Sequence, residues 1–263
     1  MSAPVVVHEV KDGIVHIVLN RPETANGMDV SLLKALHDAV MECHSRPNLR
    51  VVVLSGAGKH FCAGGDVKDF ASKGEGLPDY LREATAWLQN ATRALIELPA
   101  PVIAKVQGYA AGGGGLGLVC ASDFVIAADT ARFMSGAVRV GMAPDGGVTA
   151  TLTQLVGLRK AMDIILTNPT LTAEEAASIG LITRVAQEHH LAAEVDALAE
   201  SLAESAPLAL AASKRLLWRG LGASVHDVLP EEARTVSELS GTEDAREGLA
   251  AVIERRAPKF VGR

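Results

Sequence analysis

The sequence predicts an α/β protein whose strands end well before the C-terminus, after which only helices follow. Three observations predict this class: β-branched runs of strand length, apolar positions at helical spacing between them, and a composition poor in aromatics. Apolar residues make up 48% of the 263-residue chain but aromatics only 3%, and 25 residues are glycine. The core must therefore be built from aliphatic side chains with close backbone contacts. A chain of this length can bury such a core without metal or disulfide cross-links.

The N-terminal third predicts a hairpin, a helix and a buried strand. The β-branched runs Val5 to Val10 and Ile14 to Leu19 are joined by Asp12-Gly13, a pair typical of two-residue hairpin turns. Apolar residues recur at helical spacing from Val30 to Cys43, and the run from Val51 to Leu54 is typical of a strand buried on both faces.

The strand, loop and helix pattern then repeats twice before the chain becomes helical. The expected elements are a helix from Asp79 to Leu98, a strand from Pro101 to Val106, a helix from Gly112 to Cys120, and strands at Phe124 to Ala127 and Arg132 to Met134. Helices are expected at Thr149 to Val156, at Leu158 to Leu166, from a cap at Thr172, and onward to Ile253. The segment 67–78 is predicted to be a mobile loop. We place a core at residues 1–200 and a C-terminal helical region at 201–263.

Charge and cysteine content exclude several classes of protein. The net charge of −6 and the absence of a basic stripe argue against nucleic-acid binding. The three cysteines have no C-x-x-C spacing, so neither a disulfide framework nor a metal site is predicted, and the cytoplasm is the expected compartment. We find neither the charge order of a signal peptide nor an apolar run of about 18 residues, so no membrane contact is expected.

Two glycine-rich segments are the candidate binding loops. Gly112 to Gly117 matches the G-x-G-x-x-G dinucleotide pattern, but that pattern alone is weak evidence. Glycines at a helix start also expose N–H groups that bind an anion or a developing oxyanion. The segment Ala63-Gly64-Gly65 can supply another N–H, and two converging donors would stabilise an enolate.

The segments H-F-C-A-G-G-D (60–66) and V-Q-G-Y-A-A-G-G-G (106–114) resemble the two signature segments of the crotonase (enoyl-CoA hydratase/isomerase) superfamily. The resemblance extends from N-R-P at 20–22, through L-T-A-E-E-A at 171–176, to A-P-K-F-V-G-R at 257–263. It implies a spiral of ββα units with a C-terminal helical region that drives formation of a homotrimer or a dimer of trimers.

The resemblance also implies a site for an acyl-CoA thioester, with coenzyme A entering as part of the substrate and no separate cofactor. The N–H groups of Ala63 and Gly113 would form the oxyanion hole, and the backbone from Ala63 through Gly64 and Gly65 to Asp66 would hold CoA. Lys259 and Phe260 would reach CoA from an adjoining subunit. Leu116 and Ala137 stand where family hydratases carry their two glutamates, so both would border the acyl group and ordinary hydration is not expected.

Asp145 is the remaining candidate acid–base group, and its setting resembles that of the aspartate in isomerases of the family. One carboxylate is sufficient to move a double bond from Δ3 to Δ2. The alternative interpretation makes Asp145 an N-cap of the following helix, which would lower its pKa, whereas burial would raise it.

Two other functions remain open from sequence. The segment 158–176 and Asp145 resemble the 4-chlorobenzoyl-CoA dehalogenase branch, in which an aspartate attacks an aromatic ring, although Ala137 replaces the tryptophan of that branch. A non-catalytic acyl-CoA-binding protein is the second alternative. Cys62 and His60 are interpreted as packing residues, because side chains two apart on an extended loop point in opposite directions.

Overall fold

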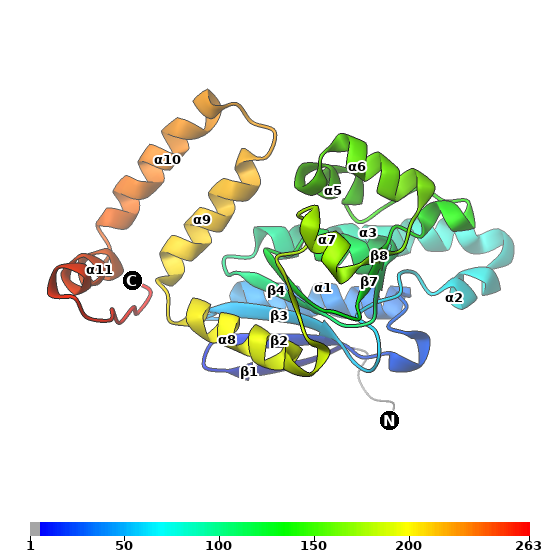
Figure 1. Ribbon diagram of the computed structural model, residues 1–263, viewed down its shortest axis with the longest axis horizontal. Helices are drawn as coiled ribbons and strands as arrows, with labels where there is room; N and C mark the ends of the chain where they lie inside the picture. Colours follow the sequence, from blue (N-terminus) through cyan, green and yellow to red (C-terminus); the bar gives the residue numbers. More distant parts are fainter. Residues whose placement is uncertain (1–5) are drawn as a thin grey trace.

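The structure is a computed structural model that describes residues 6–263 and is built on two sheets (Figure 1). The larger sheet has the order β1-β2-β3-β4-β6-β9, in which β1 is antiparallel to β2 and the other pairs are parallel. Its strands are β1 Val6–Lys11, β2 Ile14–Leu19, β3 Val51–Gly56, β4 Val102–Val106, β6 Phe124–Ala128 and β9 Arg184–Ala186. The smaller sheet contains β5 Tyr109–Ala111, β7 Arg132–Met134 and β8 Leu171–Thr172.

Helices cover the sheets and continue to the C-terminal end. The α-helices are α1 Val30–Ser45, α2 Val67–Ser72, α3 Leu77–Glu97, α4 Gly112–Cys120, α5 Val148–Val156, α6 Leu158–Met162, α7 Ala173–Ser178, α8 Leu191–Ala203, α9 Pro207–Gly220, α10 Val225–Ser240 and α11 Glu243–Glu254. Short 3₁₀ helices occur at Pro22–Thr24, Gly74–Gly76, Ala137–Val140 and Glu188–His190, and a π-helical turn at Asp163–Thr167. The α/β class predicted from sequence is confirmed.

The N-terminal hairpin forms as its turn residues predict. Asp12 and Gly13 have φ values of 51° and 80°, the positive angles that a type I′ turn requires. The backbones of Val6 and Leu19 are paired in the register that this turn sets. Val5, the first residue of the predicted run, lies outside the described residues.

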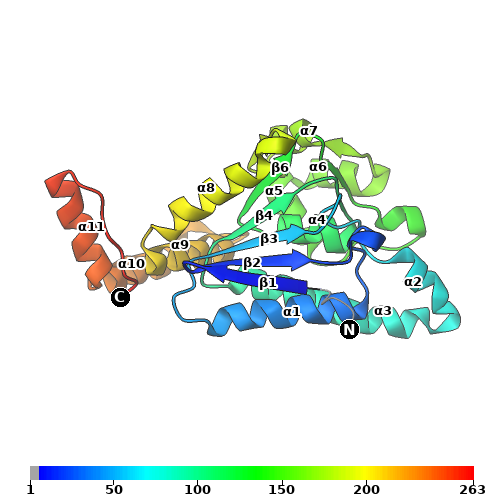
Figure 2. The same cartoon turned by 90° about the horizontal axis from the view of Figure 1, so that it is seen from below.

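The core lies around the central strands β3 and β4. Every residue of β3 is buried, because α1 and α3 pack together beneath the sheet while α8 lies on β3, β4 and β6 (Figure 2). Coverage of both faces explains why these strands are continuous apolar runs rather than alternating ones.

The prediction of a mobile loop at 67–78 is wrong, because this segment is helical. Asp66 caps α2 by accepting a hydrogen bond from the N–H of Asp69, and α3 starts at Leu77 after a 3₁₀ turn. The short strands β5, β8 and β9 were not predicted, since two or three residues carry no detectable periodicity. None of the helices in residues 6–263 combines the length and the apolar composition that a membrane crossing requires.

Helices α9, α10 and α11 lie to one side of the sheets in Figure 1. A buried ion pair anchors α9 to the core: Nζ of Lys214 lies 2.7 Å from a carboxylate oxygen of Asp123 and also donates to the carbonyls of Leu95 and Ala100. Trp218 donates to the other carboxylate oxygen of Asp123 at 2.8 Å. The predicted boundary at residue 200 falls inside α8 and stays a prediction.

The Lys214 anchor predicts a large stability effect. Lys214→Met would leave the Asp123 carboxylate buried without its cation, and we expect the free energy of unfolding to fall by about 3 kcal/mol. Urea denaturation followed by circular dichroism measures this. Lys160→Met, which breaks an exposed pair with Asp163, is the matched control and should cost no more than about 0.5 kcal/mol. Equal losses for both variants would contradict the anchoring role.

Candidate active site

Two glycine-containing segments, one following β3 and the other opening α4, lie in backbone contact. Cys62 and Ala110 form a strand-like bridge between them. A Cβ on Gly112 would lie 3.1 Å from the Cα of Gly64, and one on Gly64 would lie 3.0 Å from the carbonyl oxygen of Ala111. Gly64 and Gly112 also have φ values of +99° and +63°. Glycine is required at both positions because of the conformation as well as the contact.

The available oxyanion donors are Gly65 and Gly113 rather than Ala63 and Gly113. The N–H of Ala63 donates to the carbonyl of Ala25 at 3.0 Å, so the structure contradicts its predicted role. Among residues 6–263, the N–H groups of Gly65 and Gly113 donate to no acceptor. Gly113 is the second residue of α4, where N–H groups lack intrahelical partners and the helix dipole favours negative charge. A Cβ on Gly112 would lie 3.8 Å from the nitrogen of Gly65, which places the two donor segments side by side.

A buried asparagine holds the first glycine segment in place. The side chain of Asn26 is fully buried, and its Nδ2 donates to three carbonyls of the segment: Ala57 at 3.0 Å, His60 at 2.7 Å and Phe61 at 3.1 Å. Its Oδ1 accepts the N–H of Arg21 at 2.9 Å. Asn26 therefore adds side-chain hydrogen bonds to the backbone hydrogen bonds that this segment makes with residues 107–111.

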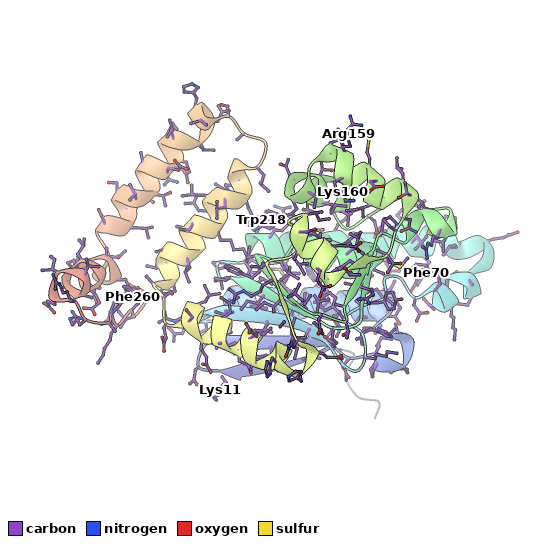
Figure 3. All side chains as sticks on the ribbon, in the orientation of Figure 1. Lys11, Phe70, Arg159, Lys160, Trp218 and Phe260 are labelled. Atoms are coloured by element: carbon purple, nitrogen blue, oxygen red, sulfur yellow. The ribbon has the colours of Figure 1, made fainter. Side chains whose placement is uncertain are left out.

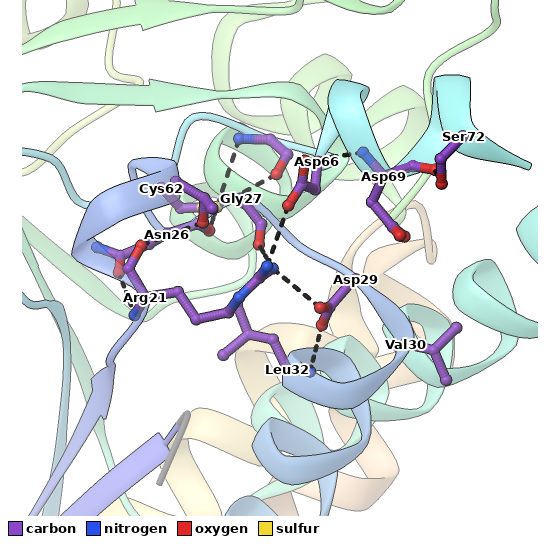
Figure 4. A network of polar contacts seen from close by, with 12 residues as sticks. Arg21, Asn26, Gly27, Asp29, Val30, Leu32, Cys62, Asp66, Asp69 and Ser72 are labelled. Atoms are coloured by element: carbon purple, nitrogen blue, oxygen red, sulfur yellow. Dashed lines mark hydrogen bonds and ion pairs between the residues drawn. The ribbon is translucent and has the colours of Figure 1, made fainter. Parts of the chain in front are cut away.

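Arg21 extends this network to the start of α2 (Figure 4). Its guanidinium lies 3.1 Å from the carboxylates of both Asp29 and Asp66 and donates to the carbonyl of Gly27. The N–H of Asp66 donates to the carbonyl of Met28 at 3.0 Å. The N–H and the side chain of Asp66 are both engaged within the protein, and this residue does not line the cavity described next. Its predicted contact with CoA stays a prediction.

A cavity of about 440 Å³ opens beside Gly65 and Gly113. Its walls are mainly aliphatic, with contributions from α1, α3 and the segment 134–145. Representative lining side chains are Leu33, Leu81, Ala84, Leu88, Met134 and Met142. The cavity therefore suits a largely hydrocarbon group whose carbonyl lies at the two N–H donors.

Asp145 is the one carboxylate among the described residues that line this cavity. A Cβ on Gly113 would overlap its Oδ1, so the carboxylate lies directly against the Cα of Gly113. Residue 113 must therefore be glycine for Asp145 to stand beside an oxyanion donor.

The capping interpretation of Asp145 is wrong. Helix α5 has Gly147 as its N-cap and no side-chain cap, and Val148 donates to the backbone carbonyl of Asp145 rather than to its carboxylate. Burial raises the pKa of the Asp145 carboxyl above the ordinary aspartate value, and its own backbone N–H offsets part of that rise. A carboxylate with a raised pKa is a stronger base.

Comparison with known proteins agrees with this geometry. The family model described as enoyl-CoA hydratase/isomerase matches residues 9–263. A Rhodobacter capsulatus protein described as "Probable enoyl-CoA hydratase" is 38% identical over 267 residues, with the whole of both chains covered. The crystal structure of an enoyl-CoA hydratase from Bacillus anthracis superposes with a TM-score of 0.93 at 32% identity, covering 98% of this chain and 100% of the other.

The chain belongs to the enoyl-CoA hydratase/isomerase family. The crotonase fold predicted from the two signature segments is thereby confirmed. A more distant relative, the trans-2-decenoyl-[acyl-carrier-protein] isomerase of Streptococcus mutans, is 28% identical over 260 residues and covers 98% of each chain.

Leu116 and Ala137, which stand where family hydratases are expected to carry their two glutamates, lie in different surroundings. Leu116 is 1% exposed, belongs to the hydrophobic core and does not line the cavity, so the prediction that it borders the substrate is wrong. Ala137 does line the cavity, at the start of a 3₁₀ turn. Neither residue offers a group that can transfer a proton.

Lys259 and Phe260 lie far from the cavity within this chain. Figure 3 places Phe260 at the opposite side of the molecule from Phe70, which lines the cavity. The C-terminal tail is held against α11, where Glu247 accepts the N–H of Lys259 at 2.8 Å and Asp244 accepts that of Val261 at 2.7 Å. Their predicted contact with CoA on an adjoining subunit stays a prediction.

The remaining candidate groups have structural roles. Burial raises the pKa of the Cys62 thiol to about 12, and Nδ1 of His60 accepts the N–H of Tyr109 at 3.2 Å, so these two side chains form no nucleophilic pair. In the part of the chain that the structure describes, no cluster of His, Cys, Asp or Glu is arranged to hold a metal ion. Sequence reasoning missed Asn26, because a single asparagine in a loop carries no pattern.

The raised pKa of Asp145 predicts a pH-dependent stability effect. A carboxyl that binds its proton more tightly in the folded state stabilises the protein at low pH, and that stabilisation is lost as the pH rises through the folded pKa. Asp145→Asn should therefore have a higher Tm than the unmodified protein at neutral pH, and the difference should disappear once both are uncharged in acid. Thermal unfolding across pH tests this, with exposed Asp196→Asn as the control. A lower Tm for Asp145→Asn at neutral pH would refute the desolvation argument.

Proposed function

We propose that this protein is a Δ3-to-Δ2 enoyl-CoA isomerase that uses Asp145 as its single acid–base group. The observation that carries this proposal is the position of Asp145, against Gly113 in an apolar cavity, with a pKa raised by burial. Hydratase names prevail among the relatives described above, but hydration needs one group to activate water and another to protonate carbon. Among the described residues that line the cavity, Asp145 is the only carboxylate available for either role.

The reaction follows from the arrangement of donors and base. The thioester oxygen of a 3-enoyl-CoA accepts hydrogen bonds from the N–H groups of Gly65 and Gly113. Asp145 removes a proton from C2, and the C2–H electrons delocalise so that the dienolate charge rests on that oxygen. The same carboxyl then protonates C4, the C2–C3 double bond forms in conjugation with the thioester, and Asp145 returns to its ionised state.

An assay of 3-enoyl-CoA conversion to the conjugated 2-enoyl thioester tests this proposal. Asp145→Asn should lower kcat by about 10²- to 10⁴-fold, whereas Asp196→Asn should leave it unchanged. The kcat/KM of the unmodified protein should rise with pH through an ionisation above the usual aspartate value, because the base must be deprotonated. Hydration of a 2-enoyl-CoA that survives Asp145→Asn would contradict the mechanism. Acyl-CoA binding without turnover would instead support the non-catalytic alternative.

We also propose that the protein is a cytoplasmic homotrimer, or a dimer of trimers. The three cysteines are free thiols, as the reducing cytoplasm favours.

The assembly is inferred from α11. One face of this helix carries Leu249, Val252 and Ile253, and their exposed fractions are 68%, 79% and 80%. Spacings of three and four residues place them on a single apolar stripe. Contact between copies would bury this stripe.

Light scattering coupled to size exclusion measures the assembly. We expect a mass of three or six chains, and we expect Val252→Asp combined with Ile253→Asp to shift the mass to smaller species, because two carboxylates would be buried in the contact. Met41→Asp, at an exposed site on α1, is the control and should leave the mass unchanged. A monomeric unmodified protein would disprove the assembly.

A further inference from the structure

Arg139 is the one cation among the described residues that line the cavity containing Asp145. It belongs to the 3₁₀ turn Ala137–Val140 in the segment 134–145, which also carries Asp145, and it is exposed to solvent where it lines the cavity. A plain hydrocarbon chain offers no acceptor for the N–H groups of a guanidinium in the cavity wall.

The position of Arg139 is fixed by Asn168, which is 3% exposed and has a left-handed backbone. Oδ1 of Asn168 accepts the N–H of Gly136 at 2.8 Å, and its backbone carbonyl accepts a hydrogen bond from Nη2 of Arg139 at 3.2 Å. One buried residue therefore holds the turn at Gly136 and the guanidinium at Arg139.

The positive charge of Arg139 is not compensated within the described chain. Its Nη2 donates to a neutral backbone carbonyl, and no carboxylate among residues 6–263 forms an ion pair with it. A guanidinium has five N–H donors in one plane, of which Asn168 engages one. The others can receive a carboxylate in the bidentate geometry that arginine favours.

We propose that Arg139 binds a carboxylate at the far end of the acyl group, so that the preferred substrates are CoA thioesters of dicarboxylic acids. This inference rests on the proposed acyl-thioester function of the cavity. Arg139 lines the same mainly aliphatic cavity that would receive the acyl chain. For that reason we assign Arg139 to the acyl group rather than to the CoA phosphates.

Binding of saturated thioesters tests the inference independently of turnover, because these compounds have no double bond to move. Isothermal titration would compare hexanoyl-CoA with adipoyl-CoA and octanoyl-CoA with suberoyl-CoA. We expect the dicarboxylic member to bind about tenfold more tightly in at least one pair. Arg139→Gln should abolish that preference without weakening the methyl-ended esters, and Arg139→Lys should retain part of it. Arg159→Gln, an exposed site outside the cavity, should keep the full preference.

Two results would overturn the proposal. One is the absence of a dicarboxylic preference in every pair, or its survival in Arg139→Gln. The other is a loss of affinity in Arg139→Gln that is equal for both members of each pair. If that loss disappears when pantetheine thioesters replace the CoA thioesters, the arginine binds the CoA phosphates. A preference that depends on Arg139 in a protein without isomerase activity would support the carboxylate site while rejecting the proposed reaction.

Discussion

Backbone contact between the segment after β3 and the start of α4 is the constraint on which the site depends. Gly64 and Gly112 approach so closely that a side chain on either would separate the segments. Separation would move the N–H of Gly65 away from that of Gly113, and an oxyanion hole requires both donors at one oxygen atom. The polar network of Asn26 and Arg21 keeps this contact from relaxing, because its donors are satisfied only in this conformation.

The position of Asp145 follows from the same constraint. Its carboxylate lies against the Cα of Gly113, and no cation among the described residues forms an ion pair with it. Burial without a counter-charge destabilises the ionised form, which is also why its pKa is raised. The nearby start of α4 supplies partial positive charge, which in the proposed reaction would act on the thioester oxygen. Under that proposal the protein is destabilised at the position where proton transfer needs a base.

Sequence patterns predicted the elements that carry strong periodicity and failed where single contacts decide. Helices α1 and α3 and strands β3 and β4 followed from their apolar patterns, and the fold followed from two signature segments. The sequence did not reveal which residue after β3 offers its N–H to an oxyanion. Only the structure shows that the carbonyl of Ala25 accepts the N–H of Ala63, while the N–H of Gly65 has no acceptor among the described residues. Leu116 was assigned to the cavity by its chain position, yet it points into the core because successive residues of α4 face different directions.

The loss of a second carboxylate imposes a geometric requirement on catalysis. In the proposed isomerisation, with Leu116 buried and Ala137 unable to ionise, one carboxyl has to reach both C2 and C4, so both carbons would present the same face to Asp145. A chain that rotates between the two proton transfers would place C4 beyond reach, and fixing only the thioester leaves that rotation free. A second fixed point at the far end of the acyl group would suppress it, because a tether at both ends restricts the bound dienolate to few conformations. Arg139 lies in the same segment as Asp145, so an acyl carboxylate held there would be aligned with the base by the backbone itself.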